Sequence, residues 1–152
     1  MKQILRILDA NFNRSREGLR VCEEITRFVL EDKVLTRDLK RVRHAVSGCV
    51  QKMPVPVSEL LSARDVRSDV GKEPSVLEKP REGAFGLFAA NIGRVKESLR
   101  VLEEVSKLID RNISDTFKKV RFDVYSIEKR TLPKLEALRH HGPLGGKRKT
   151  AS

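Results

Sequence analysis

Asparagine, arginine and glutamate recur together at three-residue spacing in two places in the sequence. The two sets are Asn11, Arg14 and Glu17, and Asn91, Arg94 and Glu97. Residues three apart in a helix are neighbours on one face, so each set would present an amide, a guanidinium and a carboxylate together. An amide can hydrogen-bond the polar edges of a ligand, and a guanidinium can hold phosphate oxygens. These residue types indicate a candidate site for a small phosphorylated ligand.

A purely structural network is the alternative for both sets. A helical wheel places the asparagine and arginine of each set inside the apolar arc of its helix, with Glu17 and Glu24 at the border. Burying unpaired polar groups costs on the order of a few kcal/mol each, so these groups must pair internally or line a cavity. Arg14 could pair with Glu17 and Arg20 with Glu24, but such pairs leave the two asparagines unexplained. Both interpretations stay open from the residues alone.

A second group of charged residues lies between the two sets. Asp65 and Asp69 carry hard oxygen ligands of the kind that bind Mg²⁺ beside a nucleotide, and Arg64 and Lys72 could neutralise phosphate oxygens. Capping of turns is the alternative for both aspartates. The sequence has no phosphate-binding glycine loop of the common nucleotide folds and no zinc-binding His-Glu-x-x-His motif.

An internal repeat predicts the elements that position these residues. Residues 11–24 match 91–104 at eight of fourteen positions, and 35–43 resemble 113–121. Apolar residues recur at three- and four-residue steps through all four segments, which indicates amphipathic helices. Such helices cannot each bury a face alone, so the sequence predicts an all-α four-helix bundle made of two repeated helical hairpins with pseudo-two-fold symmetry.

The predicted single domain spans 1–138, with hairpins at about 2–53 and 85–138 and a long loop, 54–84, between them. The loop holds four of the six prolines and one short turn near residues 58–62, and a loop of this length is usually functional or a linker. Residues 63–71 favour the functional loop, because they mix charged residues with Val66 and Val70, which could anchor the segment to the bundle. Thr36 and Ser114 are expected to cap the return helices, and Pro133 to kink or end the last one. Cys22 and Cys49 fall on apolar faces and are interpreted as small buried hydrophobes.

Charge and hydropathy narrow the class of protein. The net charge is +11, and four of these charges belong to the end of the chain, 139–152, which is expected to be a disordered basic tail. No stretch has the roughly 18 apolar residues of a membrane span. Arg6 and Asp9 interrupt the apolar run that a signal peptide would need, so a cytoplasmic location is expected.

Several segments together resemble a known family. They are residues 8–21, 27–30, 43–44, 63–65, 69–71 and 91–104. The sequence is similar, over about residues 4–130, to a small helical family often fused ahead of thiamine-phosphate synthase. Its members are described as a second type of hydroxymethylpyrimidine phosphate kinase, and the present chain resembles a standalone member.

The resemblance implies ATP with Mg²⁺ as phosphoryl donor and a pyrimidine monophosphate as acceptor. It implies that Asp65 and Asp69 lie near the metal, directly or through water, and that Arg64 acts with them in catalysis. It implies phosphate contacts from the arginines of the two sets and contacts to pyrimidine or ribose from the asparagines. The full set expected to bind substrate or ATP is Asn11, Arg14, Glu17, Arg20, Arg43, Lys72, Asn91, Arg94, Glu97 and Arg121.

Two functions from other classes remain as alternatives. The chain could be a non-catalytic helical module that binds or regulates thiamine-phosphate synthase. It could also be a nucleic-acid-binding bundle, although one tyrosine, six phenylalanines and no tryptophan leave few platforms for stacking bases. A homo-oligomer is expected, with a dimer favoured, because a small bundle can complete its site across a two-fold interface.

Overall fold

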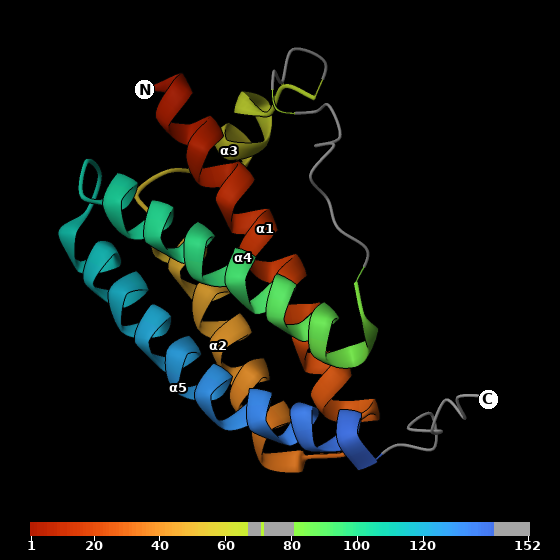
Figure 1. The fold of residues 1–152 in the computed structure, drawn as a ribbon. Coiled ribbons are helices and arrows are strands. Elements are labelled where there is room, and N and C mark those ends of the chain that lie inside the picture. The colour runs from red at the N-terminus through yellow and green to blue at the C-terminus, as the bar shows by residue number, and fades with distance from the viewer. Residues whose placement is uncertain (67–70, 72–80, 142–152) are drawn as a thin grey trace, which may run out of the picture.

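The computed structural model describes residues 1–66, 71 and 81–141, and within these ranges it contains five helices and no strand. The helices are α1 (Lys2–Phe28), α2 (Lys33–Lys52), α3 (Val57–Ala63), α4 (Gly83–Ser106) and α5 (Arg111–His141) (Figure 1). The predicted all-α class is confirmed. The short turn expected near residues 58–62 is helix α3.

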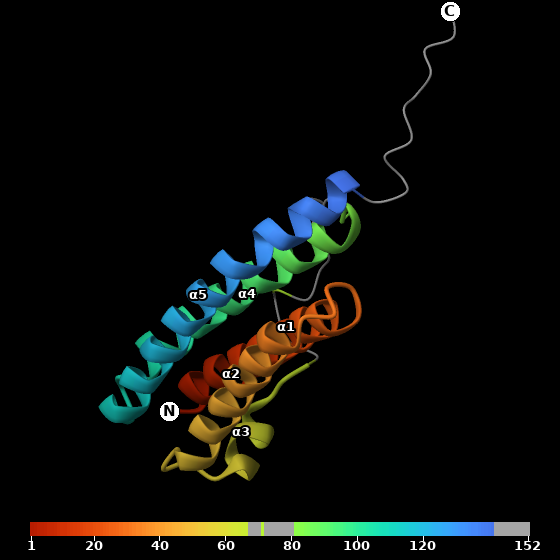
Figure 2. The same ribbon diagram turned by 90° about the horizontal axis from the view of Figure 1, so that it is seen from below.

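The four long helices surround one core. Helix α1 packs against α2 and α4, and α5 packs against the same two helices from the other side. Figure 2 shows the arrangement as two layers, with α1 and α2 in one and α4 and α5 in the other. The short helix α3 packs beside the N-terminal part of α1 (Figure 1). The predicted bundle of four long helices is therefore confirmed, while its pseudo-two-fold symmetry stays a prediction.

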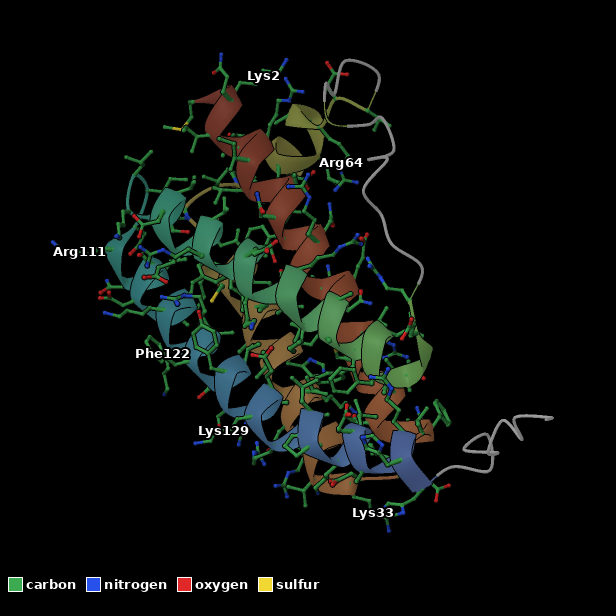
Figure 3. All side chains as sticks on the ribbon, in the orientation of Figure 1. Lys2, Lys33, Arg64, Arg111, Phe122 and Lys129 are labelled. Carbon is green, nitrogen blue, oxygen red and sulfur yellow. The ribbon has the colours of Figure 1, made fainter. Side chains whose placement is uncertain are left out.

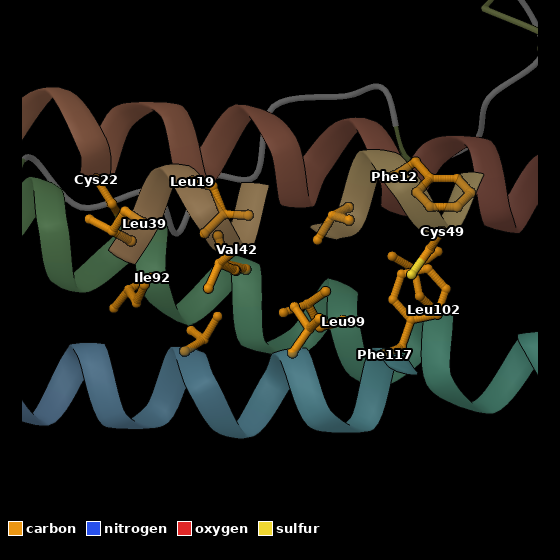
Figure 4. Packing of buried hydrophobic residues seen from close by; sticks show 14 of the residues in the cluster. Phe12, Leu19, Cys22, Leu39, Val42, Cys49, Ile92, Leu99, Leu102 and Phe117 are labelled. Atoms are coloured by element: carbon orange, nitrogen blue, oxygen red, sulfur yellow. The ribbon is translucent and has the colours of Figure 1, made fainter. Parts of the chain in front are cut away.

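Apolar residues from all four long helices interlock in the core. The rings of Phe12 and Phe117 meet with centroids 5.7 Å apart, joining α1 to α5 (Figure 4). Leu19 and Leu99 are fully buried on the facing helices α1 and α4. Burying one such side chain stabilises the fold by about 1.5–3 kcal/mol, so this core fixes how α1 and α4 face each other.

Both cysteines are buried and free, as predicted. Desolvation disfavours the thiolate and raises the pKa of Cys22 to about 12, with a contribution from the charge of Glu128. Burial also raises the pKa of Cys49. Both thiols therefore act as small apolar groups in the core.

Aspartates cap the two return helices. The carboxylate of Asp32 accepts hydrogen bonds from the backbone N–H groups of Val34 and Leu35, at 3.0 and 2.9 Å. Asp110 accepts one from the backbone N–H of Asn112 at 2.8 Å, at the start of α5. A carboxylate satisfies the free N–H groups of the first turn and favours its positive dipole end.

The caps predicted at Thr36 and Ser114 are therefore wrong, because both helices begin earlier and these residues lie in their first turns. The hydroxyl of Thr36 donates to the backbone oxygen of Asp32 at 2.7 Å, and that of Ser114 donates to the backbone oxygen of Glu103 at 2.7 Å. The bond of Thr36 is the local one that a helical hydroxyl commonly makes to the carbonyl four residues earlier, whereas the bond of Ser114 joins α5 to α4.

Helix α5 continues through Pro133 to His141, beyond the end expected at residue 138. Pro133 was predicted to kink or end the helix: the helix does not end there, and a kink stays a prediction. Leu135 is buried beyond it, and Arg139 pairs with Glu82 at 3.3 Å, so tertiary contacts hold the last turns. The rest of the expected basic tail, 142–152, lies outside the described residues.

None of the helices in 1–66 and 81–141 combines the length and apolarity needed to cross a membrane.

Candidate functional site

The two Asn-Arg-Glu sets line one cavity between α1 and α4. We call this space, of about 420 Å³, the α1–α4 cavity. Its lining is completed by Gly18, Ser98 and Val101. Each helix presents its set on the face toward the other because the three-residue spacing follows one helix face. Residues 80 positions apart in the sequence thus surround one space.

A close helix crossing forms part of this cavity. Gly18 of α1 has no side chain at the point where α4 approaches: a Cβ there would lie 2.7 Å from Cγ2 of Val95 and 3.1 Å from the backbone oxygen of Asn91. Glycine therefore allows the two backbones to approach more closely than any other residue would. The crossing fixes the separation of the two sets.

Both asparagine side chains are held by their own helices. Nδ2 of Asn11 donates to the backbone oxygen of Ile7 at 2.8 Å, and Nδ2 of Asn91 donates to that of Leu87 at 2.8 Å. Asn11 is buried and Asn91 is partly buried. Each bond uses one donor of the amide and orients the group, and the amide oxygen remains an acceptor for a ligand.

The arginines and glutamates of the two sets lie at the rim of the cavity. The wheel placed Arg14 and Arg94 within the apolar arc, but both are exposed. The reason is that α1 and α4 touch near Gly18 and leave the outer edges of their arcs uncovered. No ion pair joins Arg14 to Glu17 among the described residues, whereas the predicted Arg20–Glu24 pair occurs at 3.1 Å.

A larger cavity of about 660 Å³ adjoins the first along α1. We call it the α1–loop cavity, since it lies between the first half of α1 and the residues that follow α3. Its polar lining is Gln3, Arg6, Asp9, Asn11, Asn13, Arg14, Arg64 and Asp65. Asn11 and Arg14 line both cavities, so the two spaces meet at these side chains.

Arg64 is bound to Asp9 rather than free to hold a ligand alone. Its Nε and Nη2 donate to the two carboxylate oxygens of Asp9, each at 2.7 Å. Figure 3 labels Arg64 at the end of α3, beside α1. The hydrogen bond to Asp9, and then the charge of that carboxylate, raises the pKa of Arg64. This bidentate pair ties the residue that ends α3 to α1. The catalytic role expected for Arg64 stays a prediction.

Asp9 is a site residue that the sequence reasoning missed. It is buried among the apolar residues of α1, between Leu8 and Phe12. A carboxylate on an apolar face needs a charged partner, which was the available signal. The partner could not be assigned, because Arg64 is 55 positions away in the chain.

The residues expected near a metal are only partly described. Asp65 is exposed and lines the α1–loop cavity, whereas Asp69 and Lys72 lie outside the described residues. Within the described ranges, no three His, Cys, Asp or Glu side chains gather as a metal centre. Mg²⁺ commonly takes one or two carboxylates and fills its shell with phosphate oxygens and water, so a single carboxylate such as Asp65 fits that ion.

Three further arginines predicted to bind ligand lie in ion pairs instead. Nε of Arg43 donates to Glu23 at 2.8 Å, and Nε of Arg121 donates to Glu103 at 2.9 Å. Arg20 joins the first pair, 3.6 Å from Glu23. Neither cavity, as lined by the described residues, includes these arginines. Arg43 links α2 to α1 and Arg121 links α5 to α4, while Arg20 pairs within α1, and the ligand contacts of all three stay predictions.

The fold and the site define a small all-helical protein with paired polar cavities along its first helix. A family model described as the ThiD2 family matches residues 6–130, and the chain belongs to this family.

Curated relatives carry the name thiamine-phosphate synthase. The protein from Synechocystis sp. is 43% identical over 126 residues, which cover 82% of this chain and 35% of the relative. That from Thermosynechococcus vestitus is 40% identical over 138 residues, covering 90% and 38%. That from Rhodopirellula baltica is 36% identical over 126 residues, covering 82% and 33%. The chain thus spans about a third of the length of these relatives. No solved structure matches it.

Proposed function

We propose that the protein is a kinase that converts hydroxymethylpyrimidine monophosphate to the diphosphate with ATP and Mg²⁺, a step of thiamine biosynthesis. Membership of the ThiD2 family and relatives named thiamine-phosphate synthase support the thiamine role. The kinase reaction is what the family resemblance implies. The observation that supports it best is the meeting of two cavities, which offers adjoining places for two ligands.

Phosphoryl transfer depends mainly on positioning and on cancelling charge over the transferred group. In this proposal Arg14 and Arg94 hold phosphate oxygens, and the amide oxygens of Asn11 and Asn91 accept hydrogen bonds from a ligand ring or hydroxyl. Mg²⁺, with Asp65 as one ligand, would neutralise charge on the triphosphate. The amides, held by their own helices, orient the acceptor before the reaction, and the guanidinium groups attract its phosphate.

The chemical step needs little help from a base. An oxygen of the acceptor's phosphate forms a bond to the γ-phosphorus of ATP, and the bond from that phosphorus to the β,γ-bridging oxygen breaks, releasing ADP. The attacking phosphate oxygen is already anionic at neutral pH, so no proton has to be removed. This fits a site built from asparagine, arginine and carboxylate side chains.

The test is to incubate the protein with ATP, Mg²⁺ and the pyrimidine monophosphate and to follow ADP release with a coupled assay. We expect turnover that needs all three components. Arg14→Ala and Asp65→Asn should each lower kcat/KM at least tenfold, which is about 1.4 kcal/mol of transition-state stabilisation. Arg16→Ala is the matched control, since this exposed arginine of α1 lines neither cavity in the described structure.

Absence of turnover, with circular dichroism showing folded protein, would refute the kinase proposal. Binding of thiamine-phosphate synthase by a catalytically silent chain would then favour the non-catalytic helical module. The observation that favours this second function is that the relatives are named thiamine-phosphate synthase.

A further inference from the structure

The two cavities differ in size. The α1–loop cavity measures about 660 Å³ and the α1–α4 cavity about 420 Å³. Both fall in the range of small-molecule sites, roughly 300–1,000 Å³. A nucleoside triphosphate is the larger of the two ligands that the proposed function requires, so size matches the nucleotide to the α1–loop cavity.

The charged residues that line the two cavities support the same assignment. In the α1–loop cavity, Asp9 is paired with Arg64 by a bidentate bond, and the lining also carries Arg6, Arg14 and Asp65. Two cations and one hard oxygen ligand suit a triphosphate that carries Mg²⁺.

The α1–α4 cavity is balanced instead. Its lining carries two arginines, two glutamates and both asparagines. Arginine can hold the single phosphate of a pyrimidine monophosphate. The carboxylates and amide oxygens can accept hydrogen bonds from donors on its ring. This mixed lining suits a ligand with one phosphate and a polar ring better than a triphosphate.

Arg14 stands where the two cavities meet. It lines both of them, and no described residue forms an ion pair with it. Phosphoryl transfer requires the terminal phosphate of the donor and the phosphate of the acceptor to adjoin in line. Arg14 is therefore placed to contact the phosphoryl group as it passes from the donor in one cavity to the acceptor in the other.

We infer, resting on the proposed function, that the α1–loop cavity takes the nucleotide, the α1–α4 cavity takes the pyrimidine monophosphate, and Arg14 holds the transferred phosphoryl group between them. The β,γ-bridging oxygen leaves toward the α1–loop cavity with ADP. The new phosphorus–oxygen bond forms on the side of the α1–α4 cavity. Arg6 and Arg94 each serve one ligand, whereas Arg14 serves both.

The test measures each ligand alone by isothermal titration calorimetry. The probes are the Mg²⁺ complex of a non-hydrolysable ATP analogue and the pyrimidine monophosphate. Arg6→Ala should raise the Kd of the nucleotide at least about tenfold and leave that of the pyrimidine unchanged. Arg94→Ala should do the reverse. Glu97→Gln is a second variant for the α1–α4 cavity, Arg16→Ala is the neutral control, and thermal melting checks that each variant is folded.

In turnover, Arg14→Ala should lower kcat, while Arg6→Ala and Arg94→Ala should each raise the KM of one substrate. The inference is wrong if Arg6→Ala weakens binding of the pyrimidine and Arg94→Ala weakens binding of the nucleotide, or if both variants weaken both ligands equally. It is also wrong if the wild-type protein binds neither probe. Selective binding without turnover would refute the proposed kinase and keep the assignment of the cavities. Turnover with a reversed pattern would refute only the assignment.

Discussion

Adding one methyl group at Gly18 should destabilise the bundle, although alanine is the better helix former. A Cβ at this position would lie 2.7 Å from Cγ2 of Val95, which is fully buried, and 3.1 Å from the backbone oxygen of Asn91. Ordinary contacts of a Cβ lie at 3.4–4 Å. Valine is stiff at χ1, so the contact is relieved mainly by moving α1 away from α4.

The expected size follows from two opposing effects. Replacing glycine by alanine inside a helix stabilises it by about 0.8–1 kcal/mol. Overpacking a well-filled core costs about 1–3 kcal/mol. The net expectation for Gly18→Ala is a fall of about 1 kcal/mol in the free energy of unfolding. Gly48→Ala and Gly93→Ala are matched controls, since nothing lies within 4 Å of a Cβ at either position. Both should gain about 0.5–1 kcal/mol.

Urea denaturation followed by circular dichroism measures these differences. Adding Val95→Ala removes the methyl group that meets the new Cβ, so the double variant should be more stable than the sum of the single changes predicts, by about 1 kcal/mol. The reasoning is wrong if Gly18→Ala is as stable as Gly48→Ala, or if the changes at Gly18 and Val95 are additive.

Three further predictions concern charged and buried groups. The pKa of Cys22 is raised from 9.0 to about 12. At pH 8 this thiol should therefore react with a thiol reagent about a thousandfold more slowly in the folded than in the unfolded protein. Equally fast reaction in the folded protein would contradict its burial. Glu23→Ala removes the partner of Arg43, whose side chain is only 18% exposed. The free energy of unfolding, measured with urea, should fall by about 3 kcal/mol. A fall below about 1 kcal/mol, the ordinary value for a surface ion pair, would contradict this. Asp32→Ala should cost about 1 kcal/mol at neutral pH, because the cap of α2 is lost. Hydrogen bonds from Leu35 and Lys134 lower the pKa of Asp32 from its ordinary 3.8, so this carboxylate stabilises the fold above that pH and the cost should shrink as pH falls below it; a pH-independent difference would contradict the sign.

The internal repeat was enough to predict the four long helices and the polar sets they carry. Apolar periodicity determines which face of a helix is buried, whereas the register between two packed helices determines which of their residues come close. Asn11 and Asn91 both line the α1–α4 cavity, and the sequence left open whether such residues line a cavity or pair internally. The α1–loop cavity could not be predicted in this way, because it depends on where the segment after α3 turns back onto α1.

Ion pairs between residues far apart in the sequence also could not be predicted. Periodicity places Asp9 on an apolar face but says nothing of its partner Arg64. Likewise, pairing of Arg43 with Glu23 depends on the register between α1 and α2, which a helical wheel of one helix does not contain. Helix starts were misplaced for a local reason, since both Asp32 and Thr36 are acceptable capping residues by type.

The central claim is that this chain transfers a phosphoryl group from ATP to a pyrimidine monophosphate bound beside Arg14. Phosphorus NMR of the complete reaction tests it most directly, because it identifies the product rather than the loss of ATP. We expect the singlet of the monophosphate to be replaced by two coupled doublets of an organic diphosphate, in step with the appearance of ADP. A spectrum in which ATP yields only ADP and inorganic phosphate, or remains unchanged, while the monophosphate singlet persists, would contradict it.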